Sequence, residues 1–87
     1  MIKYKVVQLC QQDALSIIPT ERIAIDMEKT AEHLIKNEFS AENEGVMVTA
    51  SKDGIGISIY KNGRILISGT TSKEKADEIG RDIYSIQ

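Results

Sequence analysis

The sequence has 87 residues, enough for one domain, and 41% of them are hydrophobic while 28% are charged, a balance typical of a globular protein. No apolar run approaches the about 18 residues that a membrane-spanning helix needs, so the composition excludes a membrane protein. The formal net charge is −2, whereas proteins that bind duplex DNA usually present a basic surface. Residues 21–44 contain seven acids and three bases, and the rest of the chain has only a mild excess of bases.

The N-terminal residues 1–5 contain no long apolar core and no small-residue cleavage site, so they do not have the pattern of a signal peptide. Cys10 has no second cysteine with which to form an internal disulfide. We therefore expect a reduced, cytoplasmic environment. We also expect Cys10 to be a buried, inert thiol, because it follows a predicted strand and has no His or Asn nearby in the sequence.

The first half of the chain predicts one strand and one helix. Residues 2–9, centred on Val6 and Val7, are typical of a strand, whereas residues 11–20 fit no single pattern. From residue 20 onward the apolar side chains recur at helical spacing and form one stripe, which predicts a helix that ends near residue 39. Pro19 suits the start of this helix, and Asp26 is an alternative N-cap that would place the start later.

Three consecutive strands follow, each with valine, isoleucine or alanine at alternate positions: residues 46–52, 55–61 and 65–68. Asp53 and Gly54 suit a two-residue turn between the first two strands. A turn of that length would pair Val48 with Ile59, so that the apolar side chains of both strands share one face.

The second turn of this meander has two alternatives. A two-residue loop of Asn62 and Gly63 would place Tyr60 opposite Ile65 and mix the two faces of the sheet. A three-residue loop at 61–63, with Gly63 at positive φ, keeps the isoleucines on one face. Because a one-residue slip moves every side chain of a strand to the other face, the hydrophobic pattern favours the three-residue loop.

Residues 72–86 predict a second amphipathic helix. The helix begins at Thr71, which forms a capping box with Glu74, or at Ser72. Asp77 and Arg81 have the spacing of a favourable i,i+4 ion pair. The predicted fold class is therefore α+β, a single domain of residues 1–87 with a four-stranded antiparallel sheet in the order strand–helix–strand–strand–strand–helix, and with both helices on one face of that sheet.

The last third of the chain resembles one repeat of the TATA-box-binding protein family. In that family a strand ends in Phe, and then come a Gly-Lys turn, an apolar strand that closes in Thr-Gly, and a Ser-capped acidic helix start. The corresponding residues of this chain, in the same order, are Tyr60, Gly63-Arg64, residues 65–67, Ser68-Gly69 and residues 72–74. The order of the predicted elements extends the resemblance to the whole chain.

The resemblance implies that the sheet face away from the helices contacts nucleic acid through Ser58, Tyr60, Leu66 and Ser68. The family bends DNA with two repeats and Phe wedges. This chain has one repeat and a Tyr, so a comparable saddle would need a homodimer. One predicted function is therefore an interaction module that binds a protein partner, a second copy of itself or nucleic acid on this face, with the phosphates contacted by Lys52, Lys61 and Arg64.

The chain also resembles, in length, element order and acidity, the small uncharacterised α+β proteins of methanogenic archaea, some of which carry acidic cation-binding surfaces. Residues 38–45 place oxygen-bearing side chains at alternate positions before Gly45, like the first half of a calcium-binding loop. The bidentate Glu of the second half would fall at Ser51 and is missing. The first predicted function is a non-enzymatic binding protein with a weak Ca²⁺ site formed by Glu38, Ser40, Glu42 and Glu44.

The remaining polar residues give weaker indications. Glu28 and Glu32 are four residues apart on one helix face and would extend the acidic surface. His33 has no second His or Cys to complete a transition-metal site, so we expect a surface residue. The sequence contains no Walker loop, dinucleotide fingerprint or nucleophile elbow, and we therefore expect a protein without enzymatic activity.

Overall fold

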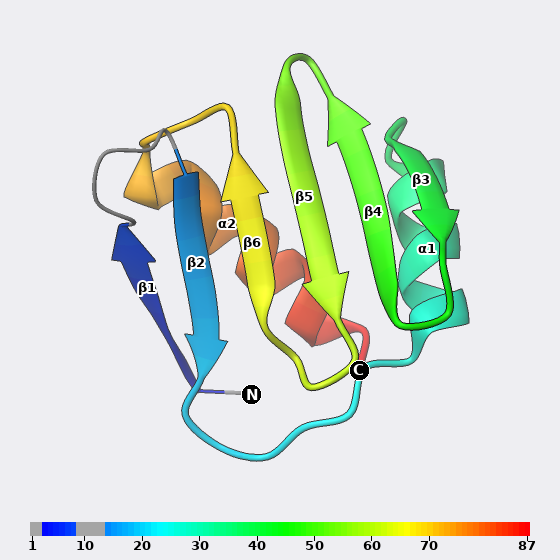
Figure 1. Cartoon of the computed structure of the whole chain (residues 1–87), viewed down its shortest axis with the longest axis horizontal. Helices are drawn as coiled ribbons and strands as arrows, with labels where there is room; N and C mark the ends of the chain where they lie inside the picture. The colour runs from blue at the N-terminus through cyan, green and yellow to red at the C-terminus, as the bar shows by residue number, and fades with distance from the viewer. Residues whose placement is uncertain (1–2, 9–13) are drawn as a thin grey trace.

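The structure is a computed structural model that describes residues 3–8 and 14–87. Within these residues the chain forms one six-stranded antiparallel sheet whose strands lie in the order β1-β2-β6-β5-β4-β3. The strands are β1 (Tyr4–Gln8), β2 (Ala14–Pro19), β3 (Ser40–Asn43), β4 (Met47–Lys52), β5 (Ile55–Tyr60) and β6 (Ile65–Ser68). Two helices, α1 (Met27–Lys36) and α2 (Lys73–Ser85), lie behind the sheet in Figure 1.

The α+β class and the helices on one face of the sheet are confirmed, but the prediction of four strands was wrong. β2 was missed because the segment had no clear pattern, although Leu15 and Ile17 alternate and both are fully buried. β3 was missed because it is a short edge strand in which only Ala41 is partly buried. An edge strand with polar side chains has no hydrophobic alternation by which a sequence could reveal it.

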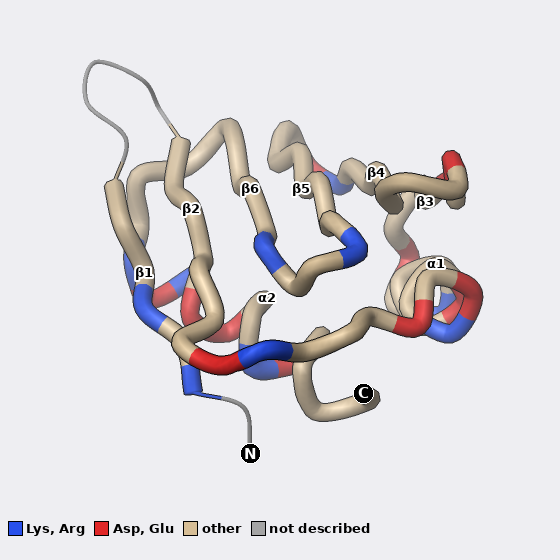
Figure 2. The backbone as a smooth tube through the Cα atoms, turned by 60° about the horizontal axis from the view of Figure 1, so that its bottom comes forward, with Lys and Arg blue, Asp and Glu red and all other residues tan. Residues whose placement is uncertain are grey.

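The first helix begins at Met27 rather than at residue 20, so the later of the two predicted starts is the correct one. The Asp26 side chain accepts a hydrogen bond of 3.0 Å from the backbone N–H of Lys29, as an N-cap residue does. The preceding residues 21–26 are extended and run beneath one end of the sheet (Figure 2). Ile25 is buried there, and its backbone N–H donates to the carbonyl of Lys61 at 3.3 Å.

Both predicted hairpin registers are confirmed. Val48 pairs with Ile59 across a turn in which Asp53 and Gly54 have φ values of 51° and 81°. In the next hairpin the N–H of Gly63 donates to the carbonyl of Tyr60 at 2.9 Å, and Gly63 has a φ of 98°. This is the three-residue loop that the hydrophobic pattern favoured, with a glycine in the left-handed conformation that other residues rarely adopt.

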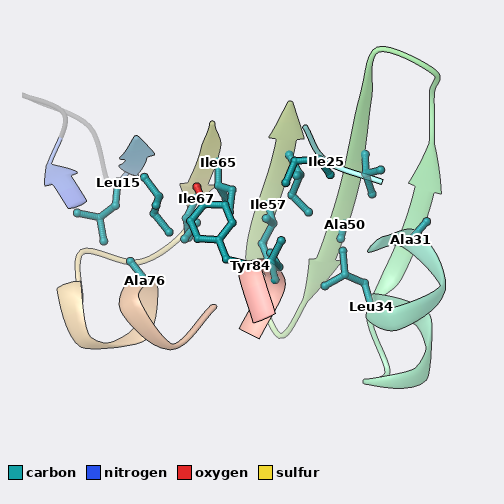
Figure 3. Packing of buried hydrophobic residues seen from close by; sticks show 14 residues of the cluster. Leu15, Ile25, Ala31, Leu34, Ala50, Ile57, Ile65, Ile67, Ala76 and Tyr84 are labelled. Carbon is teal, nitrogen blue, oxygen red and sulfur yellow. The ribbon is translucent and has the colours of Figure 1, made fainter. Parts of the chain in front are cut away.

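The second helix begins after Ser72, whose side chain accepts a 3.2 Å hydrogen bond from the N–H of Lys75, so Thr71 is not the cap. The predicted pair of Asp77 and Arg81 is present at 2.7 Å. Helix α2 packs on β1 and β2, and α1 packs on β3 and β4. The core lies between the sheet and the two helices (Figure 3), and its sheet side consists of fully or almost fully buried residues: Leu15, Ile17, Val48, Ile57, Ile59, Ile65 and Ile67.

The Gln87 side chain joins the end of α2 to the start of α1. Its Oε1 accepts from the N–H of Asp26 at 2.9 Å, and its Nε2 donates to Thr30 Oγ1 at 3.1 Å and to the Ile83 carbonyl at 2.9 Å. Thr30 is completely buried. No helix among the described residues is long and apolar enough to cross a membrane.

We expect the substitution Gln87→Ala to lower the free energy of unfolding by about 1–2 kcal/mol, because it leaves the buried hydroxyl of Thr30 without this hydrogen bond. Urea denaturation measures the change. In a Thr30→Val background that hydroxyl is gone, so Gln87→Ala should there cost clearly less. An equal cost in both backgrounds would show that the interaction between Gln87 and Thr30 does not stabilise the fold.

Candidate functional site

The sheet face opposite the two helices is uncovered, and we call it the open face. Side chains alternate between the two faces of a strand, so the residues next to buried core positions point to this side. The strand registers place one row of side chains across the whole open face, in the order Val7, Ser16, Leu66, Ser58, Thr49 and Glu42. The open face therefore combines hydroxyl groups and scattered apolar side chains.

The four residues that the resemblance assigned to nucleic-acid contact all lie on the open face. Ser58 is the cross-strand partner of Leu66, Ser68 is the partner of Gly56, and Tyr60 is the partner of Met47. Ser58, Tyr60 and Leu66 are half-buried and Ser68 is exposed. The structure thus brings the four residues together on the open face.

A hollow of ≈ 420 Å³ opens on this face and is lined by Tyr60, Asn62, Arg64 and Leu66. Arg64 is held in place at the hollow, since its Nε donates to the hydroxyl of the fully buried Ser16 at 3.2 Å. The Oδ1 atom of Asn62 accepts from the backbone N–H of Arg64 at 3.0 Å, which fixes the turn. The hollow therefore offers one aromatic ring, one aliphatic side chain and one guanidinium group.

Basic residues gather at one end of the open face, and we call this region the basic end. Its members come from the start of β1, the segment after β2 and the β5–β6 turn: Lys3, Lys5, Arg22, Lys61 and Arg64 (Figure 2). Lys5 points to the open face because its neighbour Tyr4 points to the other side, where its hydroxyl donates to Asp77 of α2 at 2.5 Å. Two acids, Glu21 and Asp26, lie in the segment after β2.

A second hollow of ≈ 440 Å³ joins the basic end to the first hollow. Both share Asn62 and Arg64, and Arg22, Glu21 and Ile18 line the second hollow as well. Within residues 3–8 and 14–87 the close contacts between a basic and an acidic side chain are His33–Asp82 and Arg81–Asp77, and neither uses a residue of the basic end. The positive charges of this region are therefore available to an anionic ligand.

The sequence did not predict that Lys3, Lys5 and Arg22 belong to this site, and Lys52 was assigned to the wrong face of the sheet. Lys3 and Lys5 are two residues apart in an extended segment, which was the available signal that they share a face. Arg22 was missed because it fell inside the helix predicted from residue 20. Lys52 was expected on the open face, but its Nζ lies on the helix side, 3.0 Å from the Asn37 carbonyl and 5.3 Å from the centre of the Phe39 ring.

The predicted calcium loop has a different backbone from the one expected. Instead of a loop with converging oxygens, residues Ser40–Asn43 form edge strand β3, and Glu42 is the cross-strand partner of Thr49 on the open face. Of the four predicted ligands, Ser40 and Glu42 line a shallow hollow of ≈ 580 Å³. Among residues 3–8 and 14–87 no three His, Cys, Asp or Glu residues form a group that could hold a metal ion. Ca²⁺ binding through Glu38, Ser40, Glu42 and Glu44 stays a prediction.

His33 and Cys10 are the remaining residues whose environment was predicted from the sequence. His33 lies at the surface side of α1, as expected, but it is not isolated, because its Nε2 atom is 2.8 Å from Oδ2 of Asp82 in α2. This hydrogen bond links the two helices on the far side of the sheet from the open face. Cys10 lies outside the described residues.

Comparison with known proteins gives one finding about the family. The family model for "Transcription factor TFIID (or TATA-binding protein, TBP)" matches residues 19–86, which is most of the chain. No curated protein and no solved structure gives a significant match.

Proposed function

The chain belongs to the TATA-binding protein family, and on this premise we propose that it is a non-enzymatic binding module whose open sheet face binds nucleic acid at the basic end. The observation that carries the proposal is that three distant segments bring basic residues to one end of the open face, where Arg64 lines both hollows and Arg22 lines the second. Nucleic-acid affinity depends largely on the interactions of such lysines and arginines with phosphates.

The opposite end of the same face limits how much of it takes part. Glu42 lies on the open face at β3, and Glu44 follows that strand. Carboxylates repel phosphates, and screening reduces the repulsion only beyond about 8 Å at physiological salt. We therefore place the binding surface on β1, β2, β6, the end of β5 and the β5–β6 turn rather than on the whole sheet.

The test is fluorescence anisotropy with labelled oligonucleotides at low and physiological salt. We expect the double variant Lys5→Ala/Lys61→Ala to weaken binding at every sequence and to lower the slope of log K against log salt by roughly 1 for each lysine that binds a phosphate in the unmodified protein. Neither side chain makes a hydrogen bond or ion pair with another described residue, so the variant should fold normally.

The matched control is Lys73→Ala/Lys75→Ala, which removes the same charge from exposed positions on α2, behind the sheet. It should bind as the unmodified protein does. If both double variants lose affinity equally, the attraction is a property of net charge and not of the basic end. If the unmodified protein binds no nucleic acid even at low salt, the proposal is wrong, and a protein partner becomes the better interpretation of the open face.

A further inference from the structure

We propose that the basic end selects single-stranded over double-stranded nucleic acid, with one unpaired base stacked on Tyr60 in the hollow and the adjoining phosphates bound by Arg64 and Lys61. This inference rests on the proposed function and names the ligand class of the same site. Three features of the structure carry it: the composition of the hollow, the way in which Arg64 is held, and the distribution of charge over the open face.

The hollow has the side chains that an unpaired base needs. Its volume of ≈ 420 Å³ falls in the range of about 300–1,000 Å³ that is usual for small-ligand sites. Tyr60 supplies an aromatic ring and Leu66 an aliphatic side chain, so a base can stack and still have an apolar neighbour. Aromatic side chains on a sheet surface are a common means of binding single strands, because every base presents a π-face.

Arg64 is arranged to bind phosphate beside that base. Its Nε donates to the buried hydroxyl of Ser16, so the two terminal nitrogens of the guanidinium group can donate to a phosphate. The hydrogen bond to Ser16 also restricts the side chain, so less conformational entropy is lost when a ligand binds. Lys61 lies three residues earlier in the same turn and is exposed, where it can bind the next phosphate.

The charge distribution disfavours a duplex. The molecule measures 32 × 29 × 20 Å, and its two longer dimensions are those of the view in Figure 1, onto the sheet. DNA is stiff over about 150 base pairs, so a duplex that lies across the strands from the basic end toward β3 would carry its phosphates over Glu42. A single strand is flexible and can leave the face after the basic end, so it avoids that repulsion.

Tyr60 is also poorly suited to the alternative in which a side chain opens a duplex step. Proteins that kink the minor groove insert apolar wedges such as Phe, Leu or Ile. Tyr60 carries a polar hydroxyl and is half-buried in the sheet surface beside Met47, its cross-strand partner. Insertion into a duplex would cost the free energy of unstacking two base pairs, whereas stacking on a base that is already unpaired does not. Stacking on an unpaired base is therefore the more favourable interaction for this ring.

The experiment compares the full chain with labelled 12-mers of single-stranded DNA, single-stranded RNA and duplex DNA by fluorescence anisotropy in the same buffer. We expect the single strands to bind at least tenfold more tightly than the duplex. Tyr60→Ala should weaken single-strand binding roughly tenfold or more, as loss of a stacking platform does, and should leave weak duplex binding unchanged. Tyr60→Phe keeps the ring and should bind within twofold of the unmodified protein.

The outcomes separate this inference from the proposed function. Equal or tighter duplex binding that is still lost in Lys5→Ala/Lys61→Ala would overturn the single-strand inference and leave the proposed function standing. Single-strand binding that Tyr60→Ala does not weaken, while the variant's circular dichroism is unchanged, would also overturn it. No binding of any oligonucleotide at low salt would overturn both.

Discussion

The substitution Gly69→Ala is expected to lower the free energy of unfolding by about 3 kcal/mol or more, which is a large part of the total for a domain of this size. Gly69 follows β6 with a φ of 85°, a conformation that side-chain-bearing residues rarely adopt. An added Cβ would overlap the backbone carbonyl oxygen of Gly54 and would lie 3.3 Å from the Cα of Ile55. Backbone atoms cannot move aside as a flexible side chain can, so the β4–β5 turn itself would have to shift.

Gly45→Ala is the matched control for this effect. Gly45 has almost the same φ, 87°, but a Cβ there would have no atom within 4 Å. It should therefore cost only the backbone term of about 1–2 kcal/mol. Urea denaturation of both variants measures the difference, and thermal unfolding should show Gly69→Ala melting at least about 12 °C below the unmodified protein. Equal losses for the two variants would show that Gly69 and Gly54 do not approach each other closely.

The central hairpins could be predicted from the sequence because two independent constraints agree there. Gly54 and Gly63 mark positions of positive φ, and the alternating isoleucines allow only one register for each turn length. The helix predicted from residue 20 failed because Ile23 and Ile25 also fit a two-residue period. Arg22 before them and Ala24 between them are exposed, so this alternation was a usable signal of an extended segment.

The basic end could not be predicted because it depends on long-range pairing. β2 lies between β1 and β6, and this order places Lys5 of β1 near Arg64 of the distant β5–β6 turn. No local sequence pattern specifies which strands of a sheet are neighbours. The sequence did place Tyr60 and Leu66 on one face, because face assignment needs only the two-residue period. Charge content along the chain is thus a weaker guide to this site than the order of strands.

The same division applies to the acidic segment, where the sequence pattern does not distinguish a loop from a strand. Alternate oxygens at Ser40, Glu42 and Glu44 fit a calcium-binding loop, but they also fit an edge strand whose polar side chains prevent pairing with other sheets. In the strand, consecutive alternate residues are separated along an extended backbone, whereas a calcium loop folds its ligands around one point. The two arrangements give the same sequence pattern and opposite geometries.

Tyr84→Phe is expected to change how stability depends on pH. Tyr84 is buried between α2 and the sheet, and its hydroxyl donates to the Gly63 carbonyl at 2.6 Å. Burial, with a smaller contribution from the neighbouring Tyr4, raises the pKa of Tyr84 from 10.0 to about 12. The folded protein therefore retains this proton at a pH where the unfolded chain has lost it. Its contribution to stability is complete below pH 10 and decreases as the pH rises toward 12.

The decrease amounts to at most about 1.4 kcal/mol for each unit of pH in that interval, or about 2 kcal/mol by its upper end. Near neutral pH, Tyr84→Phe should be less stable than the unmodified protein by about 1 kcal/mol, because the Gly63 carbonyl loses a hydrogen bond. In the alkaline interval the order should reverse, since Phe has no proton to lose. Urea denaturation over this pH range measures the free energy of unfolding of both proteins. The control is Tyr60→Phe on the open face, which retains Tyr84 and should therefore still lose stability at alkaline pH. Parallel curves for Tyr84→Phe and the unmodified protein would show that the Tyr84 hydroxyl is not buried in the core. They would also contradict the hydrogen bond from Tyr84 to the Gly63 carbonyl, which connects α2 to the turn before Arg64.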